Sequence, residues 1–345
     1  MSEFHQLQIN AVEPLTKDSV KISFTIPQEL KTKYRFIAGQ YLSLKTFING
    51  ETVIRDYSIC SSPSSGELSV GIKRLNGGLF SSYAQTLNVG DMLDVRTPQG
   101  RFVLGQDTLT FVGIAAGSGI TPIMSLLQHF LEHSKGEAYL IYGNKTPEDS
   151  MFLSALKMLK NSYQDRLHLQ WIFSRIEMPE EGFGRINANK IESFLQDCSL
   201  KVGKCHFYLC GPNDMVQEVK GKLSALGHPE NNIQYELFFV PTEASDNSAV
   251  SDSKTKITLV LDGESAEFEM SRNQFVLDAA LAKNFDAPYS CKGGVCSSCI
   301  AKVTEGNVEM VQNNVLTDAD LKSGYILTCQ SRPTSPSLTV DYDDV

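Results

Sequence analysis

The chain has 345 residues, of which 41% are hydrophobic and 21% charged, a balance that argues against both a disordered chain and an integral membrane protein. At about 150 residues per domain, this length predicts two or three domains. The formal net charge of -9 argues against a nucleic-acid-binding protein, because such proteins present a basic surface to phosphates.

Two segments bear on the compartment in which the protein works. The longest run without a charged side chain, residues 108–131, contains Gly117, Gly119 and Pro122, so we expect a strand, a turn and a helix rather than a membrane span. The first ten residues, MSEFHQLQIN, lack the apolar core of a secretory signal. We therefore expect a cytoplasmic protein whose eight cysteines stay reduced, so that clustered cysteines bind metal.

Short strand-like runs fill the chain up to residue 104. The clearest are residues 20–26, 40–47 and 68–73, separated by clusters of Gly, Pro, Ser and Asn. This spacing predicts a small antiparallel β-barrel or sandwich.

Residues 55–58, Arg-Asp-Tyr-Ser, form the first candidate binding motif. In a regular strand Arg55 and Tyr57 share one face, so the guanidinium could hold a phosphate while the phenol ring packs on a planar cofactor. Ser58 would add a hydroxyl group. Taken alone, the motif is more often explained by an edge arginine beside a core tyrosine, and the motifs that follow it favour the binding role.

From residue 105 to 240, apolar runs alternate with helical stretches, which predicts a parallel sheet covered by helices. The first run is followed by Gly-Ser-Gly-Ile-Thr-Pro at residues 117–122. We expect Thr121 to cap the following helix and Pro122 to be its first residue, so that Gly117 and Gly119 bring backbone amides close to a phosphate or nicotinamide. An ordinary strand-end turn is the alternative.

A third module follows the polar tract of residues 241–254, which we interpret as a linker. Residues 256–270 alternate with period two around Asp262-Gly263, which predicts a hairpin, and residues 275–283 are typical of a helix. Residues 255–345 are therefore expected to form an α+β module. Counted from residue 241, this part carries 16 acidic and 8 basic side chains, a net charge of -8.

The strongest signal is the spacing of four cysteines. Cys291, Cys296 and Cys299 form a C-x4-C-x2-C run with Cys329 further along, which is the plant-type pattern for a [2Fe-2S] cluster. The alternatives are structural zinc and four unrelated buried cysteines, but zinc sites usually pair two C-x2-C knuckles and only one is present. The remaining cysteines have no ligand spacing and are expected in or near the core: Cys60, Cys198, Cys205 and Cys210.

Together these motifs are similar to those of the ferredoxin-NADP reductase family. Residues 55–58 are followed by GGLFS at residues 77–81 and by PxGRF at residues 98–102, and IYGNKT at residues 141–146 extends the likeness. The succession of modules resembles the reductase components of bacterial oxygenases. The resemblance implies an antiparallel β-barrel that binds FAD at 1–104, an α/β NAD(P)-binding domain at 105–240 and a β-grasp [2Fe-2S] ferredoxin domain at 255–345.

The resemblance also implies roles for individual residues. Those expected to bind FAD are Arg55, Tyr57, Ser58, Gly71, Lys73, Gly78, Ser81, Thr121 and Phe238. Those expected to bind NAD(P)H are Gly117, Gly119, Thr121, Pro122, Ser174, Arg175, Cys210, Gly211 and Pro212. Catalytic roles beside the reacting rings fall to Ser58, Cys210 and Glu236. For Phe238, ordinary core packing is the alternative.

Ser174 and Arg175 bear on the choice of nucleotide. A hydroxyl and a guanidinium suit the adenosine 2'-phosphate, whereas a carboxylate for the ribose diol would indicate NADH. We therefore favour NADPH over NADH, with a solvated loop arginine as the alternative reading of Arg175.

Three redox sites on one chain imply a reaction. A nicotinamide gives up two electrons as hydride, a cluster accepts one, and a flavin bridges the mismatch. We expect an oxidoreductase that passes electrons from NAD(P)H through FAD and [2Fe-2S] to a partner oxygenase, for which the resemblance favours phenylacetyl-CoA epoxidase. The alternatives are another oxygenase, a free-standing diaphorase, and a non-catalytic redox sensor or zinc-stabilised protein.

Overall fold

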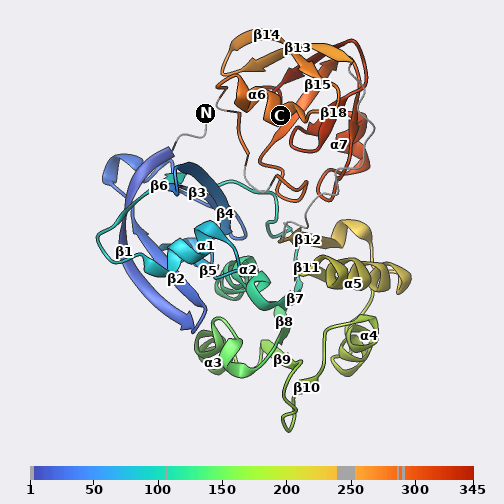
Figure 1. Cartoon of the computed structure of the whole chain (residues 1–345). Coiled ribbons are helices and arrows are strands. Elements are labelled where there is room, and N and C mark those ends of the chain that lie inside the picture. The colour runs from blue at the N-terminus through green and yellow to red at the C-terminus, as the bar shows by residue number, and fades with distance from the viewer. Residues whose placement is uncertain (1–3, 106, 239–252, 286, 290–291) are drawn as a thin grey trace. The chain divides into compact units, whose positions relative to one another are not determined.

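The computed structural model describes residues 4–105, 107–238, 253–285, 287–289 and 292–345. The chain divides into two compact units, residues 2–238 and 239–345 (Figure 1). Most of the predicted linker, residues 241–252, lies outside the described residues. None of the described helices has the length and apolar character that crossing a membrane requires.

The first sheet of the larger unit is antiparallel, with the strand order β4-β3-β6-β1-β2-β5. Its strands are β1 (Phe4–Thr16), β2 (Ser19–Thr25), β3 (Tyr41–Ile48), β4 (Glu51–Ser58), β5 (Leu68–Lys73) and β6 (Met92–Arg96). The two edges meet just beyond β4, where Ile59 pairs with Val70 of β5. The sheet thus closes around its apolar side chains, and the predicted barrel is confirmed. A short helix, α1 (Leu79–Tyr83), follows β5.

The second sheet is parallel throughout, with the order β10-β9-β8-β7-β11-β12. Its strands are β7 (Thr110–Ala116), β8 (Glu137–Asn144), β9 (Leu167–Phe173), β10 (Gly182–Phe183), β11 (Cys205–Gly211) and β12 (Ile233–Leu237). Its helices are α2 (Ile120–His133), α3 (Leu153–Ser162), α4 (Ala188–Asp197) and α5 (Asn213–Ala225). Figure 1 shows α2 and α3 on one side of this sheet and α4 and α5 on the other, which confirms the predicted α/β domain.

The strand order of the parallel sheet fixes where a ligand can bind. From β7 the chain winds outward through β8, β9 and β10, and then returns to place β11 on the other side of β7. The direction of winding therefore switches between β7 and β11, and in such sheets the crevice at the carboxyl ends of these two strands is the usual binding site.

The smaller unit contains a mixed sheet with the order β14-β13-β19-β15-β17 and a two-stranded sheet of β16 and β18. Its elements are β13 (Lys254–Leu261), β14 (Glu264–Ser271), α6 (Val276–Ala282), β15 (Ile300–Glu305), β16 (Val308–Met310), α7 (Asp318–Lys322), β17 (Tyr325–Leu327), β18 (Ser331–Pro333) and β19 (Ser337–Asp341). Asp262 and Gly263 join the first two strands with φ of 58° and 75°, the conformation of a tight hairpin turn. Helix α6 and β13 contribute side chains to one apolar core, so the predicted α+β module is confirmed.

Candidate functional sites

A glycine turn lies at the switch point between β7 and β11. Residues Gly117–Gly119 form one 3-10 turn that leads directly into α2. A Cβ atom at Gly119 would lie 2.1 Å from the carbonyl oxygen of Cys210, at the end of β11. Gly117 has a φ of 56°, which favours glycine, and its carbonyl accepts a 3.0 Å hydrogen bond from the Tyr142 hydroxyl. Glycine at position 119 therefore allows the turn to pack this closely on β11, whereas glycine at position 117 suits its left-handed backbone.

Helix α2 begins earlier than the sequence predicts. Ile120 is its first residue, so Thr121 and Pro122 are the second and third. The hydroxyl of Thr121 donates to the carbonyl of Ser118 at 3.0 Å and does not accept from a helix amide. The expectations that Thr121 caps the helix and that Pro122 is its first residue are therefore wrong, because Gly119 already has helical dihedral angles and the helix continues straight out of the turn.

The barrel touches the start of α2 through β5. A Cβ atom at Gly71 would lie 2.7 Å from Cγ2 of Thr121, so glycine permits a close approach here. One turn further along α2, the Ser125 hydroxyl donates to the carbonyl of Ser61 at 2.6 Å. The structure thus brings together Gly71 and Thr121, which the family resemblance places beside the flavin.

Ser58, Cys210 and Glu236 come together from three strands. Ser58 Oγ on β4 donates to Glu236 Oε2 on β12 at 3.2 Å, and Glu236 is the register partner of Cys210 on β11. Burial raises the pKa of Glu236 to about 8; the Ser58 hydrogen bond opposes this shift and the charge of Asp56 adds to it. Burial, and then the charge of Glu236, raises the pKa of the fully buried Cys210 thiol well above its usual value. Burial therefore favours the protonated forms of Glu236 and Cys210.

Arg55 and Tyr57 lie two residues apart on β4. The Arg55 side chain is exposed, and its Nη1 donates to the carbonyl of Ile54 at 2.7 Å. Tyr57 is half-buried with its ring 5.4 Å from that of Phe80, and burial raises the pKa of its phenol. An exposed guanidinium beside a packed aromatic ring is compatible with both readings of the motif, and flavin binding by these residues stays a prediction.

Ser81, Gly78 and Lys73 lie around the turn that follows β5. Ser81 Oγ accepts from the amide of Leu75 at 3.1 Å and donates to the carbonyl of Gly78 at 3.3 Å, so it also shapes the turn. Burial lowers the pKa of the half-buried Lys73, an effect that Asp149 opposes and that Lys145 reinforces. Lys73 is thus a desolvated cation at the edge of the barrel.

Ser174 and Arg175 follow β9 at the carboxyl edge of the parallel sheet. Their amides donate to the carbonyls of Asn144 and Lys145 at 2.9 and 3.0 Å, which holds the end of β9 against the end of β8. The exposed Arg175 and Lys145 therefore leave the sheet side by side. Sequence reasoning missed Lys145, although IYGNKT at residues 141–146 includes it.

Gly211, Pro212 and Phe238 complete the set of residues expected at the nucleotide and flavin. Gly211 ends β11, and a Cβ atom there would lie 2.8 Å from Cε of Met215. Pro212 is the residue before α5. The half-buried Phe238 packs against the core of the α/β domain, as its alternative reading requires. Its contact with a flavin stays a prediction.

The cysteine motif lies in the smaller unit, and Cys291 lies outside the described residues. Cys299 and Cys329 are almost fully buried and Cys296 is half-buried. The intervening loop turns sharply, with Lys292, Gly294 and Ser297 at φ of 51°, 71° and 56°. Such a loop fits a cluster of two irons, which needs thiolates shielded from water and a backbone that wraps around the inorganic sulfurs.

Second-layer hydrogen bonds hold this loop in place. Gln330 Nε2 donates to the carbonyl of Lys292 at 2.8 Å, and Thr328 Oγ1 donates to that of Cys299 at 3.0 Å. The Tyr342 hydroxyl donates to Thr328 Oγ1 at 2.9 Å. The other cysteines are in or near the core, as predicted: Cys60, Cys205 and Cys210 are buried and Cys198 is half-buried.

Three protein-family models match consecutive parts of the chain. An oxidoreductase FAD-binding domain matches residues 6–104, an oxidoreductase NAD-binding domain residues 114–221, and a 2Fe-2S iron-sulfur cluster binding domain residues 259–334. The chain is 38% identical to a subunit of 1,2-phenylacetyl-CoA epoxidase from Escherichia coli (strain K12), over 99% of each chain. It is 32% identical to the ferredoxin reductase component of 3-ketosteroid-9-alpha-monooxygenase from Rhodococcus rhodochrous, over 97% of this chain and 96% of the relative.

Solved structures share the fold. Phthalate dioxygenase reductase, a modular structure for electron transfer from pyridine nucleotides to [2Fe-2S], aligns over 98% of each chain with a TM-score of 0.64 and 24% identity. A ferredoxin NADP+ reductase from Neisseria gonorrhoeae aligns over 69% of this chain and 100% of its own, with a TM-score of 0.60 and 22% identity. The chain therefore shares the fold of phthalate dioxygenase reductase over nearly its whole length.

Proposed function

Because this chain belongs to the ferredoxin-NADP reductase family, as an oxygenase reductase component with FAD-binding, NAD-binding and 2Fe-2S domains, we propose that it carries electrons from NADPH to phenylacetyl-CoA epoxidase. The single observation that carries the choice of partner is the 38% identity to the epoxidase protein over the whole chain, against 32% for the 3-ketosteroid reductase of Rhodococcus rhodochrous.

The site residues supply placement and hydrogen bonds rather than acid–base chemistry. When bound, the flavin supplies the exchange between two-electron and one-electron transfer. Gly119 lets the turn after β7 approach β11, where a flat ring can lie against the backbone. Glu236, with a pKa of about 8, presents a neutral carboxyl group at pH 7 beside Ser58. A neutral carboxyl group both donates and accepts hydrogen bonds, so it can orient a carboxamide without adding a net charge.

The choice of NADPH is supported by the cations at the carboxyl edge of the parallel sheet. Arg175 and Lys145 emerge side by side from β9 and β8, and Ser174 adds a hydroxyl. A guanidinium, an ammonium and a hydroxyl together suit a phosphate monoester.

Steady-state kinetics test the nucleotide. We expect kcat/KM for NADPH to exceed that for NADH in the wild type, and Arg175→Ala to lower the NADPH value by about tenfold or more, the equivalent of one charge-assisted hydrogen bond. Lys204→Ala, an exposed cation elsewhere in the same domain, is the control. A wild type that prefers NADH would overturn this part of the proposal.

Reconstitution tests the partner. The purified reductase should support turnover by the oxygenase component of phenylacetyl-CoA epoxidase and not by that of a 3-ketosteroid monooxygenase. The reverse pattern would contradict the proposed partner. Rapid dye reduction with no stimulation of either oxygenase would indicate a free-standing diaphorase.

A further inference from the structure

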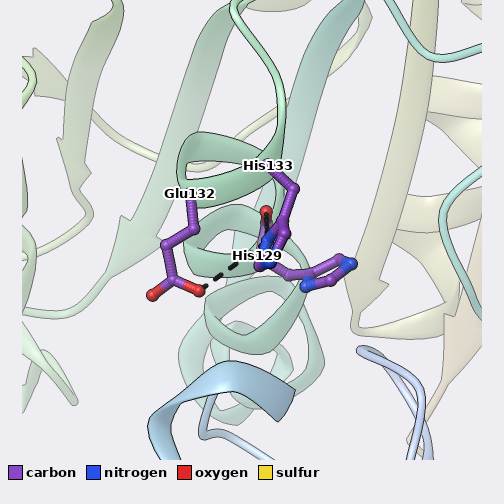
Figure 2. Close-up of side chains that lie close together, drawn as sticks. All are labelled: His129, Glu132 and His133. Carbon is purple, nitrogen blue, oxygen red and sulfur yellow. Dashed lines mark hydrogen bonds and ion pairs between the residues drawn. The ribbon is translucent and has the colours of Figure 1, made fainter.

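A second group of potential ligands lies at the end of α2, away from the glycine turn. His129, Glu132 and His133 project from the last turns of the helix, and one ligand atom from each lies within 4.8 Å of the others (Figure 2). Their spacing of three and four residues places them as neighbours on the helix surface. The family motifs do not include these residues.

Each imidazole, when neutral, has one nitrogen lone pair that it can donate to a metal ion. The rings lie 4.3 Å apart. Because a carbonyl can only accept, His133 Nδ1, which lies 3.0 Å from the carbonyl of His129, carries the proton and leaves the lone pair on Nε2. This is the arrangement in which metal-binding histidines are usually held. Among the described residues, the buried Nδ1 of His129 has no hydrogen-bond partner, which costs free energy.

Glu132 is oriented by a second layer of polar groups. Its Oε2 accepts hydrogen bonds from Ser62 Oγ and Ser64 Oγ, each at 2.5 Å, and it lies 4.0 Å from His133 Nδ1. A carboxylate has about four lone-pair positions, so it can accept both hydroxyls and still coordinate an ion. The two serines belong to the barrel, whereas Glu132 belongs to the α/β domain.

We propose that His129, Glu132 and His133 form a binding site for a divalent transition-metal ion of the Zn²⁺ class, with water completing its coordination. Two imidazoles and one carboxylate are a ligand set for Zn²⁺ and its neighbours in the first transition row. Mg²⁺ and Ca²⁺ prefer oxygen ligands alone. Since the serines of the barrel hold Glu132, the bound ion strengthens the attachment of α2 to the loop after β4.

Calorimetric titration with Zn²⁺ tests the site on the untagged full chain with its flavin and cluster in place. We expect one equivalent to bind to the wild type and this binding to be lost in His133→Gln. Glu132→Gln should bind at least tenfold more weakly, and Ser62→Ala about tenfold, as for other groups that orient a ligand. The matched control is His168→Gln, because His168 is a half-exposed histidine 3.3 Å from a single carboxylate, Glu137.

Iron content and unfolding temperature are the two further measurements that distinguish this site from other sites of Zn²⁺ binding. The iron content must be unchanged after titration, which separates this site from displacement of cluster iron. Zn²⁺ should also raise the unfolding temperature of the wild type and of His168→Gln but not of His133→Gln, whose side chain is 53% exposed and removable without disturbing the core. Absence of Zn²⁺ binding in the wild type, or unchanged binding in both His133→Gln and Glu132→Gln, would overturn the proposal.

Discussion

Glu236 is a carboxyl group that keeps its proton in the folded protein up to a pH of about 8, whereas its ordinary pKa is 4.5. Unfolding therefore releases a proton between these two pH values. Because the unfolded chain binds fewer protons than the folded one in this window, the free energy of unfolding falls as the pH rises through it and levels off above about pH 8.

Replacing Glu236 by glutamine should remove this pH dependence. We expect Glu236→Gln to unfold at a higher temperature than the wild type at pH 9, by about 2–4 °C for each kcal/mol gained, and to show a smaller gain at pH 5.5. Thermal unfolding followed by flavin fluorescence measures this, with Glu230→Gln, an exposed carboxylate, as the control. An equal gain at both pH values would mean that burial does not perturb Glu236.

Cys299 is expected to be a cluster ligand because it has the required spacing and is almost fully buried in the smaller unit. Cys299→Ser should remove the cluster and leave the flavin in place. Iron and acid-labile sulfide per chain, together with flavin absorbance, measure the two cofactors separately, and Cys198→Ser is the control outside the motif. Unchanged iron content and an unchanged EPR spectrum of the reduced protein would rule out this ligand.

Arg55 is expected to hold a flavin phosphate. Its guanidinium is exposed on β4 and donates a 2.7 Å hydrogen bond to the backbone of its own strand, so it can be redirected to a ligand at low cost. Arg55→Ala should weaken FAD binding by about 10- to 150-fold, as expected for about 1.5–3 kcal/mol. Flavin retained after dialysis measures this, with Arg35→Ala as an exposed control in the barrel. Full retention of FAD in Arg55→Ala would contradict the assignment.

At the scale of elements, the turn Gly117–Gly119 and helix α2 form one continuous structure that joins the sites. Its first end packs on β11, its N-terminal turns contact β5 of the barrel through Gly71, and its last turn is bonded to Ser62 and Ser64. Displacement of α2 would therefore change the nucleotide turn and the barrel contact together.

The two glycines of this turn should respond differently to alanine. At Gly117 a Cβ atom meets nothing within 4 Å, so Gly117→Ala should cost only the left-handed conformation, about 1–2 kcal/mol. At Gly119 a Cβ atom would overlap the Cys210 carbonyl, so Gly119→Ala should destabilise more and raise KM for the nucleotide. Urea denaturation and steady-state kinetics measure both; an equal or smaller effect of Gly119→Ala would show that the turn can move away from β11.

At the scale of the whole molecule, negative charge is concentrated in the part that holds the cluster motif. Residues 241–345 account for -8 of the net charge of -9. Opposite charges on a partner would accelerate association at low ionic strength, and salt would screen this attraction.

Electron delivery to the oxygenase should therefore slow as salt increases. We expect the second-order rate constant for reduction of the partner to fall between low and physiological ionic strength, while reduction of the flavin by excess bound nucleotide, within one protein, stays nearly constant. Stopped-flow measurements resolve the two steps. A partner reaction that does not respond to salt would mean that the acidic residues do not guide docking.

Local sequence patterns were sufficient to predict an element or a site wherever the contacts that determine it lie close together in the chain. The run at residues 68–73 is β5 in the structure, and the helix expected at 275–283 is α6, Val276–Ala282. The cysteine motif is also a local pattern, because three of its four cysteines lie within a stretch of nine residues. Periodicity and ligand spacing are properties of a single segment, and so they can be read without knowing what that segment packs against.

The features of the sites that depend on contact between distant segments were determined only by the tertiary structure. Ser58 and Glu236 are 178 positions apart and meet only because β4 of the barrel lies against β12 of the parallel sheet. Helix α2 starts earlier than predicted because Gly119 already has helical dihedral angles. Gly119 also packs closely on Cys210, which lies 91 positions later in the chain. The carboxylate of Glu132 is oriented by hydrogen bonds from Ser62 and Ser64, which lie 70 and 68 positions earlier in the chain. Such contacts follow from how the domains pack, and packing leaves no period or spacing in the sequence.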